Sequence, residues 1–125
     1  MSRKMRGLNQ TKGTTLCERL ELAETRAAQN KGLLGRDGLE PGCGMLFDNQ
    51  SFLPIMWMHM FFMRFAIDIV FVDKSDRVIR INHRLKPWHI SSMVFGARRA
   101  LELEAGAAAR ASTAPGDILR FEVAD

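Results

Sequence analysis

The most apolar stretch of the chain, residues 52–72, is about as long as a membrane span but contains four residues that do not suit one. Pro54, His59, Arg64 and Asp68 interrupt it. In a lipid-facing helix, Arg64 and Asp68 would each cost roughly 2.5 to 3.5 kcal/mol near the bilayer centre. We therefore interpret this stretch as the core of a soluble domain with no integral membrane segment.

The length and charge of the chain predict one domain with a basic start. A chain of 125 residues has room for one core of ordinary size. Its 46% apolar and 26% charged residues exclude a coiled coil and wholesale disorder. The first 13 residues contain four bases and no acid, which equals the whole net charge of +4. We expect residues 1–13 to form a flexible basic tail and residues 14–125 to form a single domain.

Two further observations bear on the cellular compartment. No apolar run of signal-peptide length occurs in the first 16 residues, so we expect a cytoplasmic protein. Cys17 and Cys43 are widely spaced and belong to no CxxC motif, so they do not form a zinc site by themselves. We expect both to be free thiols packed as small apolar side chains.

Short alternating segments separated by turn residues predict a β-rich fold. Residues 55–65 are apolar at almost every position, and their aromatic content favours a strand over a helix. Short helices are expected at about 25–33 and 105–111. The expected fold is mostly β (α+β), a compact small barrel-like domain with two short peripheral helices. The other strands are expected over residues 15–24, 44–47, 68–73, 77–85, 99–104 and 117–123.

Alternation within two of these strands predicts which side chains face the core. Ile79, Ile81 and Leu85 fall on one face of their strand, whereas Arg80 and Arg84 fall on the other. In the strand at 99–104, the two leucines face inward and the two glutamates face the opposite side. Each strand is thus expected to have one core face and one polar face.

Six segments, taken in order, resemble the family called domain of unknown function 192. They span roughly residues 20–123, and the resemblance implies a predominantly β domain with a compact barrel-like core but no established activity. The chain departs from the family pattern at two places. Relatives often have Pro at Ala66 and Gly-Leu at Ser112-Thr113. Ser is less suited than Gly to the left-handed conformation that ends a helix. The segments are Gly32-Leu33-Leu34-Gly35-Arg36, Gly44-Met45-Leu46-Phe47, Trp57-Met58, Ile67 to Asp73, Leu101-Glu102-Leu103 with Ala105-Gly106, and Gly116-Asp117.

The run from Met56 to Met63 is rich in thioethers and contains His59, a combination that suits Cu(I). In a strand, however, Met56, Met58 and Met60 lie on one face while His59 lies on the other. Methionine also fills irregular cores. We interpret this run as core packing and expect no metal and no cofactor.

Asp68 and Glu102 are the carboxylates that most need an explanation, and both occupy positions of the family pattern. A buried charge is costly unless it is paired. Asp68 is expected to anchor a turn by accepting backbone N–H groups or by pairing with Arg64. The alternative is a pocket near Trp57 that Asp68, Glu102 and His59 line as ligand anchors or as a general base.

Residues 77–99 contain six bases and no acid. They could form an anion-binding ridge that includes Arg80 and Arg84. A solvated strand face with scattered arginines is the commoner outcome and is the interpretation we favour. Nucleic acid is not expected as a partner, because the domain without its first 13 residues is neutral.

The chain has no G-x-S-x-G elbow, no P-loop and no H-E-x-x-H motif, so no catalytic residue is assigned. We predict a non-catalytic module that binds a ligand or partner through the pocket near Trp57, His59, Asp68 and Glu102, or through the basic ridge. One alternative is an enzyme with a carboxylate, His or Cys site in the same pocket. Another is an accessory protein that docks on a partner through an exposed apolar patch.

Overall fold

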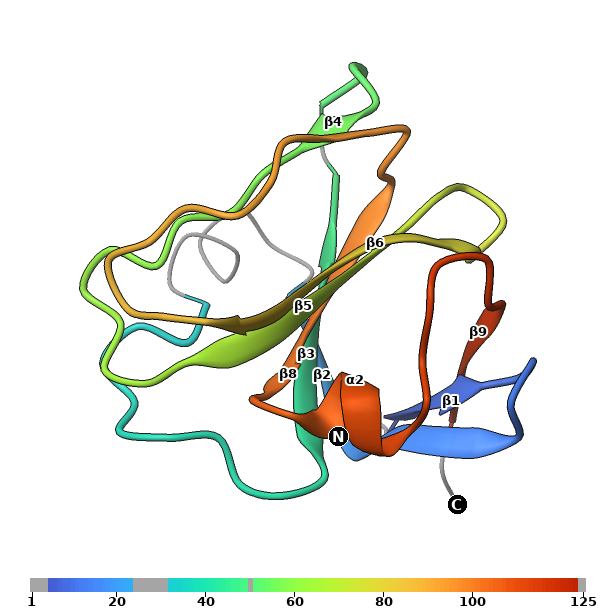
Figure 1. Ribbon diagram of the computed structural model, residues 1–125, viewed down its shortest axis with the longest axis horizontal. Helices are drawn as coiled ribbons and strands as arrows, with labels where there is room; N and C mark the ends of the chain where they lie inside the picture. Colours follow the sequence, from blue (N-terminus) through green and yellow to red (C-terminus); the bar gives the residue numbers. More distant parts are fainter. Residues whose placement is uncertain (1–4, 24–31, 50, 124–125) are drawn as a thin grey trace.

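The computed structural model describes residues 5–23, 32–49 and 51–123, and one curled sheet organises them (Figure 1). Its seven strands follow the order β6-β5-β8-β3-β2-β1-β9 and form a strongly curled half-barrel. The mostly β fold is therefore confirmed. The strands of this sheet are β1 (Met5–Asn9), β2 (Thr14–Ala23), β3 (Cys43–Asp48), β5 (Ile67–Val72), β6 (Val78–Leu85), β8 (Arg99–Glu104) and β9 (Leu119–Val123).

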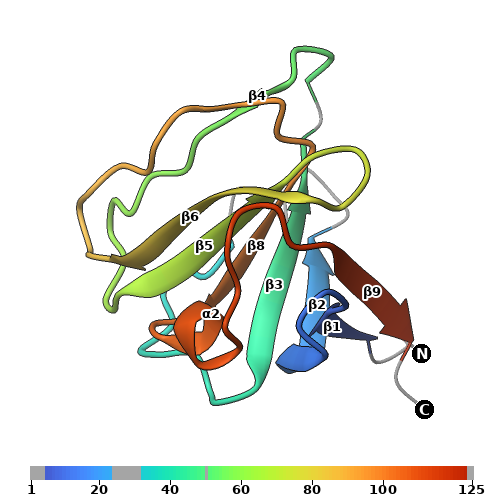
Figure 2. The ribbon, with the colours of Figure 1, turned by 45° about the vertical axis from the view of Figure 1, so that its right-hand side comes forward.

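Two smaller elements complete the described fold. β4 (Ile55–Met56) and β7 (Val94–Phe95) form a separate two-stranded ribbon, which Figure 2 shows at the end of the molecule away from β1 and β9. A single helical turn, α2 (Ala107–Arg110), follows β8 near the expected position. The helix expected at 25–33 falls mostly outside the described residues.

Strands β5 and β8 lie side by side and are buried on both faces. All six residues of β5 are buried, as are Ala100 to Leu103 of β8. Leu101 and Leu103 pack in one core cluster, whereas Ala100 packs in a second cluster on the other face of the sheet. The leucines and Glu102 thus alternate as predicted, but the glutamate face is covered as well.

The single core face predicted for β6 is wrong. Ile81 packs against the first cluster, whereas Ile79 and Leu85 pack against the second. The reason is a pair of register shifts against β5, because an extra residue in one strand reverses the side to which later side chains point. Arg80 and Arg84 are nevertheless exposed, as expected.

The N-terminal segment is part of the sheet from Met5 onward, which corrects the expectation of a flexible tail for residues 5–13. Strand β1 pairs with both β2 and β9. Arg6 forms an ion pair with Glu122 at 2.5 Å, and Lys12 forms one with Asp117 at 3.0 Å. These acidic partners lie more than 100 residues away, so the local charge count could not reveal them.

A buried polar network joins this segment to the C-terminal turn. The Asn9 side chain donates to Asp117 at 2.9 Å and to Thr113 at 3.1 Å. The hydrogen bond from Asn9 is the main reason why the pKa of Asp117 lies below its ordinary value, and Lys12 adds to the effect. The network closes the sheet by holding β1 against the loop that leads into β9.

Asp68 is completely buried and acts as the predicted backbone anchor. Its carboxylate accepts N–H groups from Arg84 at 2.8 Å, Gly106 at 3.1 Å and Ala108 at 3.0 Å. Three acceptor contacts satisfy a carboxylate that water cannot reach. Arg64 takes no part in the anchor, since it pairs instead with exposed Asp37 at 2.7 Å.

The strand expected over residues 55–65 forms only in part. It pairs with β7 at Ile55–Met56 and makes one isolated bridge between His59 and Ile90. Beyond that, Met60 exchanges backbone hydrogen bonds with the loop at 86–96, as acceptor from Trp88 N and donor to His89 O. The aromatic run therefore pairs with another loop and does not join the main sheet.

Replacing Asp68 with Ala is expected to lower the free energy of unfolding by roughly 1 to 3 kcal/mol, because three backbone N–H groups, two of them in fully buried hydrogen bonds, lose their acceptor. Chemical denaturation of both proteins measures the difference. Asp37→Ala is the control, since this exposed aspartate should change stability by less than about 0.5 kcal/mol. Equal midpoints for Asp68→Ala and wild type would contradict the anchor role.

Candidate functional site

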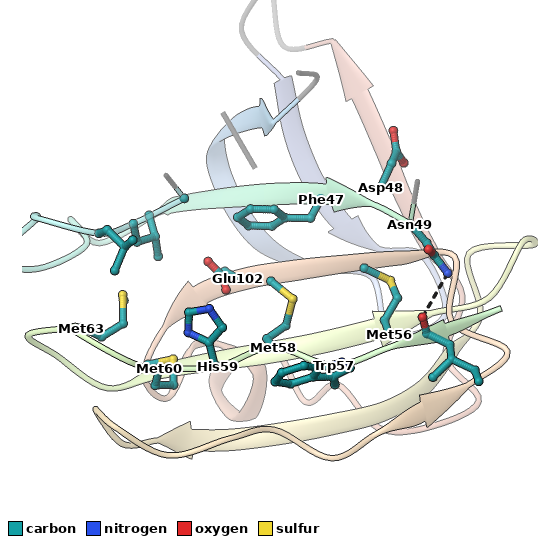
Figure 3. Close-up of a pocket in the computed structure, with 14 residues that line it drawn as sticks. Phe47, Asp48, Asn49, Met56, Trp57, Met58, His59, Met60, Met63 and Glu102 are labelled. Carbon is teal, nitrogen blue, oxygen red and sulfur yellow. Dashed lines mark hydrogen bonds between the residues drawn. The ribbon is translucent and has the colours of Figure 1, made fainter. Parts of the chain in front are cut away.

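A cavity of about 370 Å³ lies between β3 and the segment that runs from β4 to Met63 (Figure 3). Phe47 of β3 forms one wall. The opposite wall is formed by the side chains of Met56, Met58 and Met60, and Glu102 lies between the two walls. The volume falls in the range of small-molecule sites in proteins.

Asn49 fixes the end of this cavity nearest β4. Its side-chain amide donates to the carbonyl oxygens of Leu53 at 2.9 Å, Ala97 at 3.1 Å and Ile55 at 3.3 Å. The last of these bonds is the dashed line in Figure 3. One side chain thus ties the segment that carries the methionines to the end of β3 and to the loop that leads into β8.

Glu102 is the unusual group of the cavity. It extends from the middle of β8, between Met45 of β3 and Ile69 of β5, and is 6% exposed. Within the described residues its carboxyl group has neither a hydrogen-bond partner nor an ion-pair partner. Burial raises its pKa from 4.5 to about 8, because the charged form loses its water. At neutral pH the group is mostly a neutral carboxylic acid.

His59 and Trp57 lie at the rim, and both are exposed. The His59 ring stacks on Phe61 with 4.8 Å between centroids, and its Nδ1 accepts the backbone N–H of Phe61 at 3.3 Å. Trp57 lies 6.3 Å from His59 between ring centroids. These contacts orient the imidazole ring. Its Nδ1 is the nitrogen in the hydrogen bond with Phe61, and its Nε2 takes no part in that bond.

The structure brings together three of the residues predicted for the pocket, namely Trp57, His59 and Glu102. Asp68 does not join them, which corrects the prediction. In the β5–β8 pair, Asp68 is opposite Leu103 while Glu102 is opposite Ile69, so the two carboxylates lie on opposite faces of the sheet. Arg80 and Arg84 of β6 also lie outside this pocket.

Sequence reasoning missed the wall formed by Phe47 and the contribution of Met63. Phe47 belongs to the Gly44–Phe47 segment of the family pattern, which was the available signal for its importance. Only the position of β3 beside β8 brings it opposite the methionines.

The described part of the chain offers limited means for covalent or metal chemistry. It contains no group of three or more His, Cys, Asp or Glu residues placed to hold a metal ion. Cys17 and Cys43 are free thiols, as expected. Burial raises the pKa of Cys17 to about 11, so its thiol is a poor nucleophile. None of the described residues that line the cavity is Ser, Thr, Cys or Lys.

The sequence profile of domain of unknown function 192, described as an uncharacterised ACR family, matches residues 8–121. This chain belongs to the DUF192 family. The UPF0127 protein of Thermococcus sibiricus is 28% identical over 116 residues, which cover 93% of this chain and 74% of that protein. The resemblance expected from the six sequence segments is confirmed.

Solved structures extend this DUF192 comparison. A protein of unknown function from Novosphingobium aromaticivorans is 29% identical and superposes with a TM-score of 0.77, covering 94% of this chain and 83% of its own. A protein from Sinorhizobium meliloti, whose structure is described as that of a proposed transcription regulator, is 24% identical and superposes with a TM-score of 0.75. The match covers 95% of this chain and 92% of that protein. The second likeness shows the fold alone. In the described residues of this DUF192 chain, every helix is too short to cross a membrane.

Glu102→Gln is expected to remove a pH dependence of folding stability. Because the folded pKa of Glu102 is about 8 and its ordinary value is 4.5, the folded state binds more protons between these values. Protonated Glu102 therefore contributes most to the stability of the wild type below about pH 4.5, and this contribution is lost as the pH rises to about 8. Urea unfolding across this range should show that the free energy of unfolding of the Gln variant increases relative to that of the wild type as pH rises. Parallel curves would show that the carboxyl group is hydrated.

Proposed function

We propose that this protein is a small non-catalytic binding module whose cavity holds an organic ligand with an apolar body and a cationic nitrogen. The buried carboxyl group of Glu102, which has no partner among the described residues, supports this proposal. A ligand nitrogen beside it would supply the missing partner. The cytoplasmic location stays a prediction from the sequence.

The chemistry of the walls favours a cation with an apolar body. Met56, Met58 and Met60 present flexible, polarisable thioethers that adapt to irregular apolar shapes. Trp57 and Phe47 add aromatic surface, which attracts cations. Inside such walls, an ammonium group near Glu102 would favour the ionised carboxylate and lower its pKa from about 8.

Binding is favoured over catalysis because no second group is placed to work with Glu102. A hydrolytic or transfer site needs a nucleophile, a base and an orienting partner within hydrogen-bond reach. The other ionisable groups among the described residues that line the cavity are His59 and Asp48, and both are exposed. The alternative function is an enzyme in which Glu102, with a pKa near 8, acts as a lone general acid or base.

Titration with a matched pair of probes tests the proposal. Phenethylammonium carries the proposed cation, and phenethyl alcohol has the same body without charge. Wild-type protein should bind the ammonium at least tenfold more tightly, since hydrogen bonds to charged groups contribute about 1.5 to 3 kcal/mol. The affinity for the ammonium should rise between about pH 6 and about pH 8.5 as Glu102 ionises, because an alkylammonium stays charged over this range.

Two variants make the titration specific to the cavity. Glu102→Gln should bind both probes equally and lose the pH dependence. Glu104→Gln is the matched control, because Glu104 lies two residues along the same strand and pairs with Arg110 outside the cavity. Equal binding of the two probes to wild type would overturn the proposal.

Native mass spectrometry of freshly purified protein tests the same site without a chosen probe. A retained amine-containing molecule would support the proposal. A retained copper ion would overturn it in favour of a thioether metal site, because Met and His side chains suit Cu(I). Turnover of a co-purified molecule that stops in Glu102→Gln would favour the enzyme.

A further inference from the structure

A second surface, independent of the cavity occupant, stands out by its exposed apolar side chains. Nine of the eleven large hydrophobic residues exposed in the described part of the chain lie on two loops, at 52–62 and 88–95. Phe52, Phe95 and Phe62 are 90%, 73% and 71% exposed. We call the surface of these two loops the aromatic edge. An apolar surface concentrated in this way marks an interaction site.

The two loops form one continuous edge. They pair at Ile55 with Phe95 and at His59 with Ile90. The rings of Phe62 and Trp88 also touch across the loops, with 4.8 Å between centroids. Figures 1 and 2 both show the loops side by side, at the end of the molecule away from β1 and β9.

Two of these exposed aromatic residues have a strained backbone conformation. Phe62 has φ of 65° and Trp88 has φ of 70°, a region that bulky side chains rarely adopt. Trp88 is 59% exposed, so burial in the core does not explain the conformation of either residue. Strain of this kind is typical of ligand-binding segments and other functional sites.

The two segments that form and flank the aromatic edge are positively charged. Residues 49–66 and 83–98 contain no Asp or Glu, but they contain Arg64, Arg84, Lys86 and Arg98. All four are exposed, and Arg64 forms an ion pair with exposed Asp37. The rest of the chain has as many acids as bases, so these two segments account for a charge equal to the whole net charge of +4.

We propose that the aromatic edge docks on the surface of an anionic lipid membrane. Trp and Phe side chains insert at the level of the headgroups, where their apolar rings leave water. Arginine and lysine side chains beside them meet the phosphates of anionic lipids. The observation that selects this partner is charge complementarity. Arg84, Lys86 and Arg98 are exposed cations with no ion-pair partner among the described residues, and such a surface matches a uniformly anionic plane.

The two tryptophans report on this docking directly. Trp57 and Trp88 are the only tryptophans of the chain, which has no tyrosine, and both belong to the edge. Vesicles of phosphatidylcholine with phosphatidylglycerol should shift the fluorescence of the full chain to shorter wavelength, and brominated lipids should quench it. Vesicles of phosphatidylcholine alone should bind at least tenfold more weakly, and added salt should weaken binding to the mixed vesicles.

Phe62→Asn separates docking from folding. Asn tolerates positive φ, so the variant should fold with unchanged or higher stability while its vesicle affinity falls about tenfold. Val123→Ser is the matched control, because Val123 is an exposed apolar residue on β9, outside the edge. Its affinity for vesicles should equal that of the wild type.

Lys86→Gln tests the electrostatic part. Its affinity for the mixed vesicles should fall about fivefold, as expected for one cation near an anionic surface. Lys74→Gln is the control, since Lys74 is an exposed lysine in the turn between β5 and β6.

Two results would overturn the proposal. The first is the absence of any fluorescence change with mixed vesicles at low salt. The second is a shift that occurs without lipid, grows with protein concentration and accompanies a dimer in light scattering, because the edge would then bind a second copy of this chain.

Discussion

Coverage of both faces of the β5–β8 strand pair is the constraint on which the rest of the structure depends. The side chains of these strands alternate between two core clusters, so a polar residue between the strand ends is buried on either face. Arg99 and Glu104, at the ends of β8, are only partly buried. Asp68 and Glu102 are the two carboxylates between the strand ends. Their different surroundings explain why one has a structural role and the other is a candidate binding group.

Asp68 faces the side where the β8–α2 corner and the irregular end of β6 approach the sheet. Three backbone N–H groups point at its carboxylate, and no further partner is needed. Glu102 faces the side covered by methionines and Phe47, which offer it no donor. Because the described side chains around it offer no donor, the carboxyl group of Glu102 has a raised pKa and favours its protonated form. A cationic ligand would instead stabilise the ionised form. This difference supports placing the ligand at Glu102.

The same loops that close the cavity also form the outer aromatic edge. Along the segment after β4, buried Met56 and Met60 alternate with exposed Trp57 and His59. One short run of sequence thus supplies the wall of the cavity and the rim that faces solvent. Burial alternates along this run, but its methionines, Trp57 and His59 all line the cavity, and the main sheet does not extend into it.

Several features could be predicted because they depend on neighbouring residues alone. The strands at 14–23, 43–48, 67–72 and 99–104 follow from alternation and from buried apolar runs. Ser112 ends the helical turn with φ of 56°, in the left-handed region to which Ser is less well suited than Gly. The need of Asp68 for partners also followed from its apolar surroundings.

The sequence by itself determined that the chain is β-rich, that its apolar centre is a core, and that a buried aspartate must be anchored. Only the tertiary structure decided that Arg6 and Lys12 are paired, because their partners lie at the other end of the chain. It also decided that Asp68 and Glu102 lie on opposite faces, since strand register and the neighbours of a strand are set by pairings between distant segments. Local pattern fixes which way a side chain points relative to the next one; what covers it depends on the rest of the fold.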